Sequence, residues 1–162
     1  MNHLIIVMGV SGCGKTTIGK RLAEELKIPF HDADDYHPTS NVEKMKSGTP
    51  LTDADRYPWL KLLATELETW LHTGGAVLAC SALKEDYRKI LSEKVSLDWV
   101  CLSGDFGTIF ERMKTRDHFM KAEMLQSQFD TLEVPKYGIH VDVNETPEVI
   151  VRYIKNQLQS NG

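Results

Sequence analysis

The sequence predicts an α/β fold in three layers, with a five-stranded parallel sheet between helices. Short apolar runs that suit buried strands alternate along the chain with longer segments of helical periodicity. This order is typical of parallel sheets with right-handed crossovers. The first apolar run passes directly into residues 9–16, which match the phosphate-binding pattern G-x-x-x-x-G-K-[ST] at every required position. Together these observations indicate the P-loop NTPase fold class.

The first two strands are predicted from the amino-terminal pattern. Residues 4–8 form a continuous apolar run of the kind found in buried parallel strands. After the P-loop, Ile18, Leu22 and Leu26 recur every four residues with charged residues between them, which indicates a helix. A second strand then leads into an acidic cluster at residues 32–35.

Helices and strands continue to alternate after the acidic cluster. We predict a short helix at 41–48, closed by Gly48, and a long helix at 52–74, with Pro58 in its first turn. Further strands are predicted at 76–80, 97–102 and 138–142, and a last helix at about 146–158. Ligands of such sheets bind beyond the carboxyl ends of the strands. The P-loop, the acidic cluster and Ser81 all fall at such ends.

Bulk composition indicates a small soluble enzyme. With 162 residues, 41% of them hydrophobic, the chain suits one domain, residues 1–162, with a sizeable core. A net charge of −4 gives no electrostatic case for binding to nucleic acid or to a membrane surface. No apolar run approaches a membrane span, and the first strand leaves no room for a signal peptide. Three scattered cysteines fit a reducing cytosol, so we expect a cytoplasmic protein.

The P-loop residues predict how a nucleotide triphosphate binds. The glycines let the loop fold back so that backbone N–H groups point at the phosphates, next to a helix N-terminus. Lys15 is expected to reach the β- and γ-phosphates, and the Thr16 hydroxyl to hold Mg²⁺. The alternative is a chance glycine-rich turn. The predicted nucleotide-binding residues of the loop are Gly9, Ser11, Gly12, Cys13, Gly14, Lys15, Thr16 and Thr17.

Other motifs decide which class of P-loop protein this is. The D-x-x-G and N-K-x-D motifs of GTPases are absent from the sequence. Residues 105–107 spell the D-F-G of protein kinases, but the chain lacks H-R-D and is too short for that fold. A small-molecule kinase needs a carboxylate near the acceptor hydroxyl, an acceptor pocket and a mobile basic lid.

The chain offers candidates for the carboxylate and for the lid. Alternation along an extended chain would put Asp32 and Asp34 on one side, where one can help hold Mg²⁺ and the other can accept the hydroxyl proton. A solvated acidic turn is the alternative. Arg112 and Arg116 are four residues apart, hence on one face of a helix, and can bind phosphate oxygens from a lid at about 112–135. Their alternative is a charged helix facing solvent.

Longer strings along the chain resemble the gluconate kinase family. They lie at residues 30–38, 41–45, 48–60, 79–84, 87–88, 118–120, 125–129 and 132–135. The strings D-x-D-R-x-P-W-L and C-S-A-L-K are more specific than the P-loop, and the resemblance covers about residues 4 to 155. It implies a nucleoside-monophosphate-kinase-like fold, a homodimer, and ATP-dependent phosphorylation of D-gluconate at its 6-hydroxyl group. The sequence departs from the family pattern at Cys13, at Ala33, and in an apparently shortened lid at 116–118.

The resemblance also suggests an acceptor pocket suited to a carboxylate and five hydroxyl groups. Its basic candidates are Lys44, Arg56, Lys84 and Arg88, its polar candidates are His37, Asn41 and Ser81, and the lid adds His118 and Gln128. Arg56 could instead cap its neighbourhood, and Arg88 could lie on the surface. Trp59 and Trp70 are expected in the core.

These candidates combine into an in-line transfer of the γ-phosphoryl group from ATP. Asp34 accepts the proton of the attacking hydroxyl, and Lys15, Arg112 and Arg116 stabilise charge on the transferred group. Mg²⁺ is held by Thr16 and through water by Asp32. The adenine is expected between Arg112 and Asn144. Two alternatives stay open: a kinase of the same fold for shikimate or a nucleoside monophosphate, and a nucleotide-binding module without catalysis.

Overall fold

The computed structural model describes residues 3–114 and 122–161 of the chain. Five parallel strands form one sheet in the order β2-β3-β1-β4-β5. The strands are β1 His3–Met8, β2 Phe30–Asp32, β3 Gly75–Ala79, β4 Asp98–Ser103 and β5 Ile139–Asp142. The prediction of a five-stranded parallel sheet is therefore confirmed.

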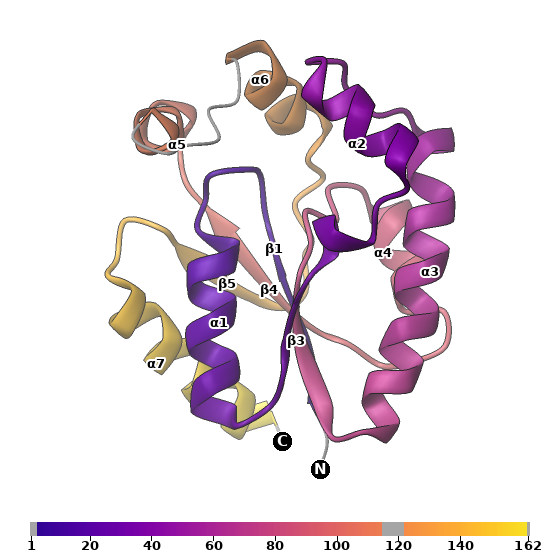
Figure 1. Cartoon of the computed structure of the whole chain (residues 1–162). Helices are drawn as coiled ribbons and strands as arrows, with labels where there is room; N and C mark the ends of the chain where they lie inside the picture. Colours follow the sequence, from indigo (N-terminus) through magenta and orange to yellow (C-terminus); the bar gives the residue numbers. More distant parts are fainter. Residues whose placement is uncertain (1–2, 115–121, 162) are drawn as a thin grey trace.

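Helices cover both faces of this sheet (Figure 1). On one side lie α1 (Lys15–Leu26) and α7 (Pro147–Asn161), and on the other lie α3 (Asp53–His72) and α4 (Glu85–Leu91). Beyond the carboxyl ends of the strands lie α2 (Thr39–Lys46), α5 (Phe106–Met113) and α6 (Ala122–Thr131). A short 3₁₀ helix, η1, spans Ala33–Tyr36. The prediction of three layers is confirmed. The helices α2, α5 and α6 cover the carboxyl ends of the strands, where ligands of such sheets bind.

The core is centred on β1, the middle strand. Leu4 is 2% exposed, and the four residues that follow it in the strand are fully inaccessible. This explains why the strand is a continuous apolar run, because helices cover both of its faces. The three cysteines, Cys13, Cys80 and Cys101, are also buried and form no disulfide.

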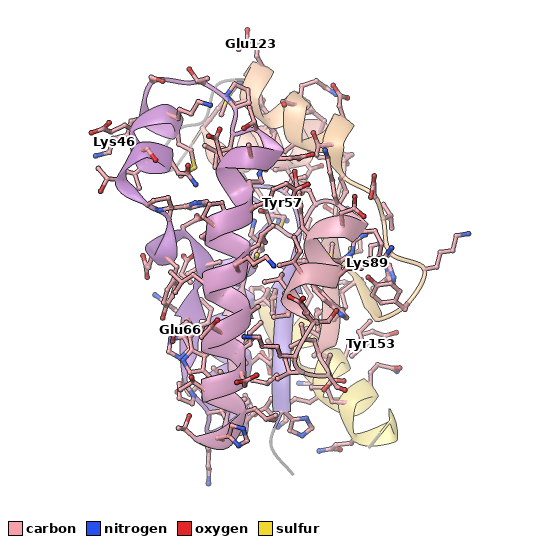
Figure 2. The ribbon with its side chains drawn as sticks, turned by 90° about the vertical axis from the view of Figure 1, so that its right-hand side faces the viewer. Lys46, Tyr57, Glu66, Lys89, Glu123 and Tyr153 are labelled. Carbon is pink, nitrogen blue, oxygen red and sulfur yellow. The ribbon has the colours of Figure 1, made fainter. Side chains whose placement is uncertain are left out.

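The longest helix, α3, begins with a capping box. The Thr52 hydroxyl accepts the backbone N–H of Asp55 at 3.1 Å, and the Asp55 carboxylate accepts the backbone N–H of Thr52 at 2.8 Å. Both bonds pair N–H groups that would otherwise lack partners at the helix start. Figure 2 shows α3 running along the molecule, with Tyr57 near its first turns and Glu66 farther along. The cap fixes the end of α3 that lies nearest the ligand-binding edge.

None of the helices in the described part of the chain combines the length and the apolar character that a membrane span requires.

Candidate active site

The P-loop joins β1 to α1 through backbone conformations that favour glycine. Gly9 has φ +149°, and a Cβ there would lie 2.8 Å from the carbonyl oxygen of Leu102. Gly14 is left-handed, with φ +98°, and forms the N-cap of α1. Side chains other than hydrogen would strain both positions, so the sequence pattern reflects loop geometry.

Lys15, the first residue of α1, lies folded over the loop. Its Nζ donates to the carbonyl oxygens of Gly9 at 2.9 Å and Val10 at 3.0 Å. Thr16 and Thr17 are exposed in the same helical turn, whereas Cys13 is buried. The loop therefore offers backbone N–H groups, one ammonium group and two hydroxyl groups to a ligand, while the Cys13 thiol belongs to the core.

Next to the P-loop lies a cavity of about 620 Å³. Its walls come from the P-loop, the ends of β2 and β3, the segment from η1 to the start of α3, and α6. Eight predicted site residues line it: Ser11, Lys15, Asp32, Asp34, His37, Arg56, Ser81 and Gln128. Ser11 and Lys15 of the P-loop thus line the same cavity as Asp32 and Asp34 of the acidic cluster.

The acidic cluster has a different backbone from the one expected. The chain is not extended through Asp34, because β2 ends at Asp32 and a 3₁₀ turn follows. Asp32 causes this change, since its Oδ1 accepts the backbone N–H of Asp34 at 3.0 Å. The assumed alternation was wrong, yet Asp32 and Asp34 both line the cavity and Asp35 is not among its lining residues.

The electrostatic environment favours a basic carboxylate at Asp34. Its side chain lines the cavity and is 78% exposed, and the surrounding protein partly desolvates it. This desolvation raises the pKa of Asp34, and the positive charge of Lys15 acts in the opposite direction. Desolvation also raises the pKa of Asp32. Carboxylates with raised pKa values bind a proton more readily, which suits a general base.

Arg56 brings a positive charge to the cavity from the first turns of α3. Its Nη1 donates to the carbonyl oxygen of Leu51 at 2.8 Å and to the hydroxyl of Tyr87 at 3.1 Å. The Tyr87 hydroxyl donates in turn to Asp53. These contacts fix the direction of the guanidinium group, so a ligand meets a charge that is already oriented.

Three predicted acceptor-side cations are not among the residues that line the cavity. Lys44 donates to Asp55 at 2.6 Å, and this bond is the largest cause that lowers the pKa of Asp55 to about 2. Lys84 donates to both oxygens of Asp53, at 3.1 and 3.3 Å. Arg88 is 2% exposed. Lys44, Lys84 and Arg88 therefore bind other groups of the protein and do not line the cavity.

Arg88 joins two segments that border the cavity. Its Nη1 donates to the carbonyl oxygen of Ala82 at 2.7 Å, and its Nη2 donates to that of Glu133 at 2.7 Å. Ala82 follows Ser81 and has a left-handed backbone, with φ +44°. Such a conformation costs a residue with a side chain on the order of 1 kcal/mol. Arg88 thus holds the strained loop after β3 against the segment after α6.

The predicted nucleotide-base site is partly described. Arg112, in the last turn of α5, donates to the carbonyl oxygen of Val143 at 2.8 Å, next to the exposed Asn144. The two predicted residues therefore lie on neighbouring segments. Arg116 and His118 lie outside the described residues, as does the prediction that Arg112 and Arg116 share a helix face.

Gln128 connects α6 with the P-loop. Its Oε1 accepts the backbone N–H of Ser11 at 2.7 Å, and its Nε2 donates to the Ser11 hydroxyl at 3.1 Å. Gln128, which falls within the predicted lid at about 112–135, therefore contacts the loop through both polar atoms of its amide group.

Comparison with known proteins identifies the family. The chain is 43% identical to the gluconokinase of Gluconobacter oxydans over 164 residues, which cover 98% of this chain and 92% of the relative. It belongs to the gluconokinase family. The thermoresistant gluconokinase of Escherichia coli is 43% identical over 157 residues, with 93% of this chain and 90% of the relative covered. The resemblance predicted from the sequence motifs is confirmed.

Solved structures and a family model agree with this assignment. A gluconokinase from Sinorhizobium meliloti superposes with a TM-score of 0.90 at 40% identity, covering 98% of this chain and 94% of that one. The family model described as shikimate kinase matches residues 11–159. The shikimate kinase of Aquifex aeolicus, at 19% identity and a TM-score of 0.65, shares the fold. The P-loop kinase fold is thus common to gluconokinases and shikimate kinases.

Several residues that line the cavity of this gluconokinase-family protein were not predicted from the sequence. Lys46, Trp59, Met124, Ser127 and Thr131 also line the cavity. The sequence predicts Trp59 in the core, and it is 3% exposed, but its ring also stacks on His37. Met124, Ser127 and Thr131 recur at helical spacing on α6. That spacing was the available signal that they share a face with Gln128.

Proposed function

We propose that this protein transfers the γ-phosphoryl group of ATP to the 6-hydroxyl group of D-gluconate, which gives 6-phospho-D-gluconate and ADP. The shared cavity carries the proposal, because Ser11 and Lys15 of the P-loop line the same space as Asp34 and Arg56. A phosphate donor and a polar acceptor can meet there. The gluconokinase relatives supply the identity of the acceptor.

In the proposed reaction, Asp34 accepts the proton of the attacking hydroxyl group. Its raised pKa and its place on the cavity wall support this role. Lys15 exchanges its bonds to the loop carbonyl groups for bonds to phosphate oxygens, and its charge stabilises the transferred group. Arg112 and Arg116 are proposed to add positive charge from the lid.

Thr16 and Asp32 are proposed to hold a Mg²⁺ ion. They would supply a hydroxyl and a carboxylate, which are hard oxygen ligands of the kind that Mg²⁺ prefers. Among the described residues, no group of three or more His, Cys, Asp or Glu side chains could hold a metal by itself. This suits an ion that shares its coordination with substrate phosphates. Bound Mg²⁺ would neutralise charge on those phosphates.

We propose that one set of residues in the acceptor pocket binds the carboxylate of gluconate and another set binds its hydroxyl groups. Arg56 and Lys46 line the cavity and can attract the carboxylate of a sugar acid. Ser81, Ser127, Gln128 and Thr131 offer hydrogen-bonding groups along the same wall. Lys44, Asn41, Lys84 and Arg88 are proposed to act through the partners they hold, and His118 as a lid residue. Adenine is proposed to bind between Arg112 and Asn144.

The test is a panel of acceptors offered with Mg-ATP, read by coupled ADP release. Gluconate is expected to exceed other sugar acids, shikimate and nucleoside monophosphates by at least about tenfold in kcat/KM, because buried polar groups reject acceptors that leave them unpaired. Phosphorus NMR of the product should place the phosphate on the 6-hydroxyl. Equal or better turnover of another acceptor would overturn the proposal.

A second candidate is shikimate phosphorylation, because the shikimate kinase model matches residues 11–159. The same panel distinguishes it from gluconate phosphorylation. A binding module without catalysis would release no ADP with any acceptor.

We also propose that residues 1–162 act as a single kinase domain with a lid at about 112–135, that the protein is a homodimer, and that it works in the cytoplasm. The family resemblance supports these assignments. Analytical ultracentrifugation tests the dimer, and a monomer at micromolar concentration would contradict it.

A further inference from the structure

His37 lies behind the proposed base with its ring plane fixed by packing. Its side chain is 3% exposed, and the ring stacks on Trp59 with centroids 4.1 Å apart and planes 17° from parallel. Trp59 is itself anchored, because its Nε1 donates to the carbonyl oxygen of Ala33 at 2.7 Å. The His37 Nε2 atom lies 3.8 Å from Oδ1 of Asp34. The imidazole therefore presents one nitrogen to the carboxylate.

Asn41 determines which nitrogen of His37 carries the hydrogen. The Nδ2 atom of Asn41 lies 2.9 Å from the carbonyl oxygen of Asp55, which can only accept, so this atom must be the amide nitrogen. The same Nδ2 lies 3.2 Å from Nδ1 of His37. Because Nδ2 is a donor, Nδ1 must accept and carries no hydrogen. A neutral ring then has its hydrogen on Nε2, the atom nearest Asp34.

The surroundings keep the ring neutral. Burial, followed by the positive charge of Arg56, lowers the pKa of His37 to about 4, and the negative charge of Asp32 opposes the shift. The carboxylate of Asp34 also faces the ring. Asp55 meets Asn41 through its backbone carbonyl, while its carboxylate binds Lys44. Near neutral pH the ring is a hydrogen-bond donor at Nε2 and holds no proton on Nδ1.

We propose that His37 is a positioning residue, held by Asn41 as the Nε2–H tautomer, that donates to Oδ1 of Asp34 and leaves Oδ2 for the substrate hydroxyl. The proposal rests on the proposed function, in which Asp34 is the base. A separation of 3.8 Å exceeds a hydrogen bond, and catalytic hydrogen bonds are often long before the substrate binds and shorten in the complex.

In this arrangement the proton of the acceptor hydroxyl group moves to Asp34 and stays there. The O–H bond of the acceptor breaks and an O–H bond forms at Oδ2, while the new O–P bond forms and the bond between the γ-phosphorus and ADP breaks. The proton does not pass on to His37, because Nε2 already carries a hydrogen and Nδ1 already accepts from Asn41. His37 acts on the reaction only through the orientation of the carboxylate.

Two substitutions of His37 distinguish the loss of the hydrogen-bond donor at Nε2 from the loss of the ring itself. A glutamine amide nitrogen reaches the place of Nε2, whereas an asparagine amide reaches only the place of Nδ1. His37→Asn is therefore expected to lower kcat about 10- to 100-fold, by analogy with the loss of a hydrogen bond that orients a metal ligand. His37→Gln is expected to lose roughly tenfold less than His37→Asn. The KM for ATP should change little in either variant, and thermal melting should show both folded.

Nitrogen-15 NMR of histidine-labelled protein without ligands measures the tautomer of His37 directly. Because no acceptor is present, this test does not depend on gluconate being the substrate. The signal of His37, identified by its loss in His37→Gln, should keep the Nε2–H pattern between about pH 5.5 and pH 8. An Nδ1–H pattern, or titration near the ordinary pKa, would overturn the proposal, as would equal kcat losses in the two variants. If the wild-type protein phosphorylates another acceptor of the panel, the proposed substrate fails, and the variants are compared with that acceptor.

Discussion

At the scale of single residues, Asp34 and Asp35 are chain neighbours with different surroundings. Asp34 lines the cavity with Lys15, and partial desolvation raises its pKa. Asp35 is exposed like Asp34, but it is not among the residues that line the cavity. The 3₁₀ turn after Asp32 separates their directions. Two carboxylates of equal intrinsic basicity therefore have unequal access to a substrate.

We expect Asp34→Asn to lower kcat by roughly 10²–10⁴-fold, because the amide keeps the shape of the side chain but cannot accept the hydroxyl proton. The KM for ATP should change little, since the P-loop holds the nucleotide. Steady-state ADP release measures both constants. Asp35→Asn is the matched control and should be much milder. A larger effect at Asp35 would contradict the assignment of the base.

Much of the site could be predicted residue by residue, but its ion pairs could not. The P-loop and the acidic cluster are local patterns with a chemical meaning of their own. Lys44 and Lys84 carry charges suited to an acid substrate, yet each is paired with a carboxylate from the start of α3. Those partners lie 11 and 31 positions away in the sequence. They come together only in the fold, where α2 and the N-cap of α4 reach the start of α3.

At the scale of elements, Arg88 attaches α4 to two other segments of the cavity wall. Arg88→Met keeps a long apolar stem but leaves the carbonyl groups of Ala82 and Glu133 without their donor. The carbonyl group of Ala82 is buried, and an unpaired buried group costs about 1–3 kcal/mol, while the part-buried bond to Glu133 adds a smaller loss. We expect the free energy of unfolding to fall by about 2–4 kcal/mol in urea titrations.

The control for Arg88 is its neighbour Lys89. It is exposed on α4, on the side of the molecule that faces the viewer in Figure 2. Lys89→Met should stay within about 0.5 kcal/mol of the wild-type protein. Equal losses in the two variants would mean that the carbonyl contacts of Arg88 add nothing to stability.

The hydrogen bonds between α6 and the P-loop are expected to limit local unfolding of α6. Gln128→Ala removes both hydrogen bonds to Ser11, each worth about 0.5–1.5 kcal/mol net. Amide protection in α6, measured by hydrogen exchange and mass spectrometry without nucleotide, should fall roughly tenfold. Gln126→Ala is the control, because Gln126 is exposed and bonds to Asp130 of its own helix. The contact is not stabilising if both variants exchange alike.

At the scale of the whole molecule, His37 makes stability depend on pH. The folded pKa of about 4 lies below the ordinary value of 6.5, so between these values the unfolded chain binds a proton that the folded protein does not. The contribution of His37 is therefore complete above about pH 6.5 and is lost as the pH falls toward 4. Asp55 adds a loss of the same sign between about pH 4 and 2. The raised pKa values of Asp32 and Asp34 act in the opposite direction.

Comparing the wild-type protein with His37→Gln isolates this contribution. Between about pH 7 and pH 5, the free energy of unfolding should fall by up to about 2 kcal/mol more in the wild-type protein than in the variant. Urea unfolding at the two pH values measures the difference. Equal pH dependence in both proteins would mean that the ring titrates alike in the folded and unfolded chains.

The sheet and the principal helices could be predicted because each is set by a local pattern of apolar residues. The strand order was not predicted, since apolar runs that alternate with helices indicate buried parallel strands but not which strands pair. The 3₁₀ turn η1 was missed for a similar reason. It depends on a side-chain bond within Asp32–Asp34 and on the indole of Trp59, 26 positions beyond the Ala33 carbonyl group that it contacts.

The burial of all three cysteines makes the folded protein suitable for site-specific labelling. Maleimides react with exposed thiolates, and burial raises the pKa of Cys80 to about 12 and also raises that of Cys101. New thiols introduced by Glu123→Cys on α6 and Lys61→Cys on α3, both at exposed positions, would therefore react first. A pair of fluorophores at these sites would follow the separation of α6 from α3 in single molecules as nucleotide and acceptor are added.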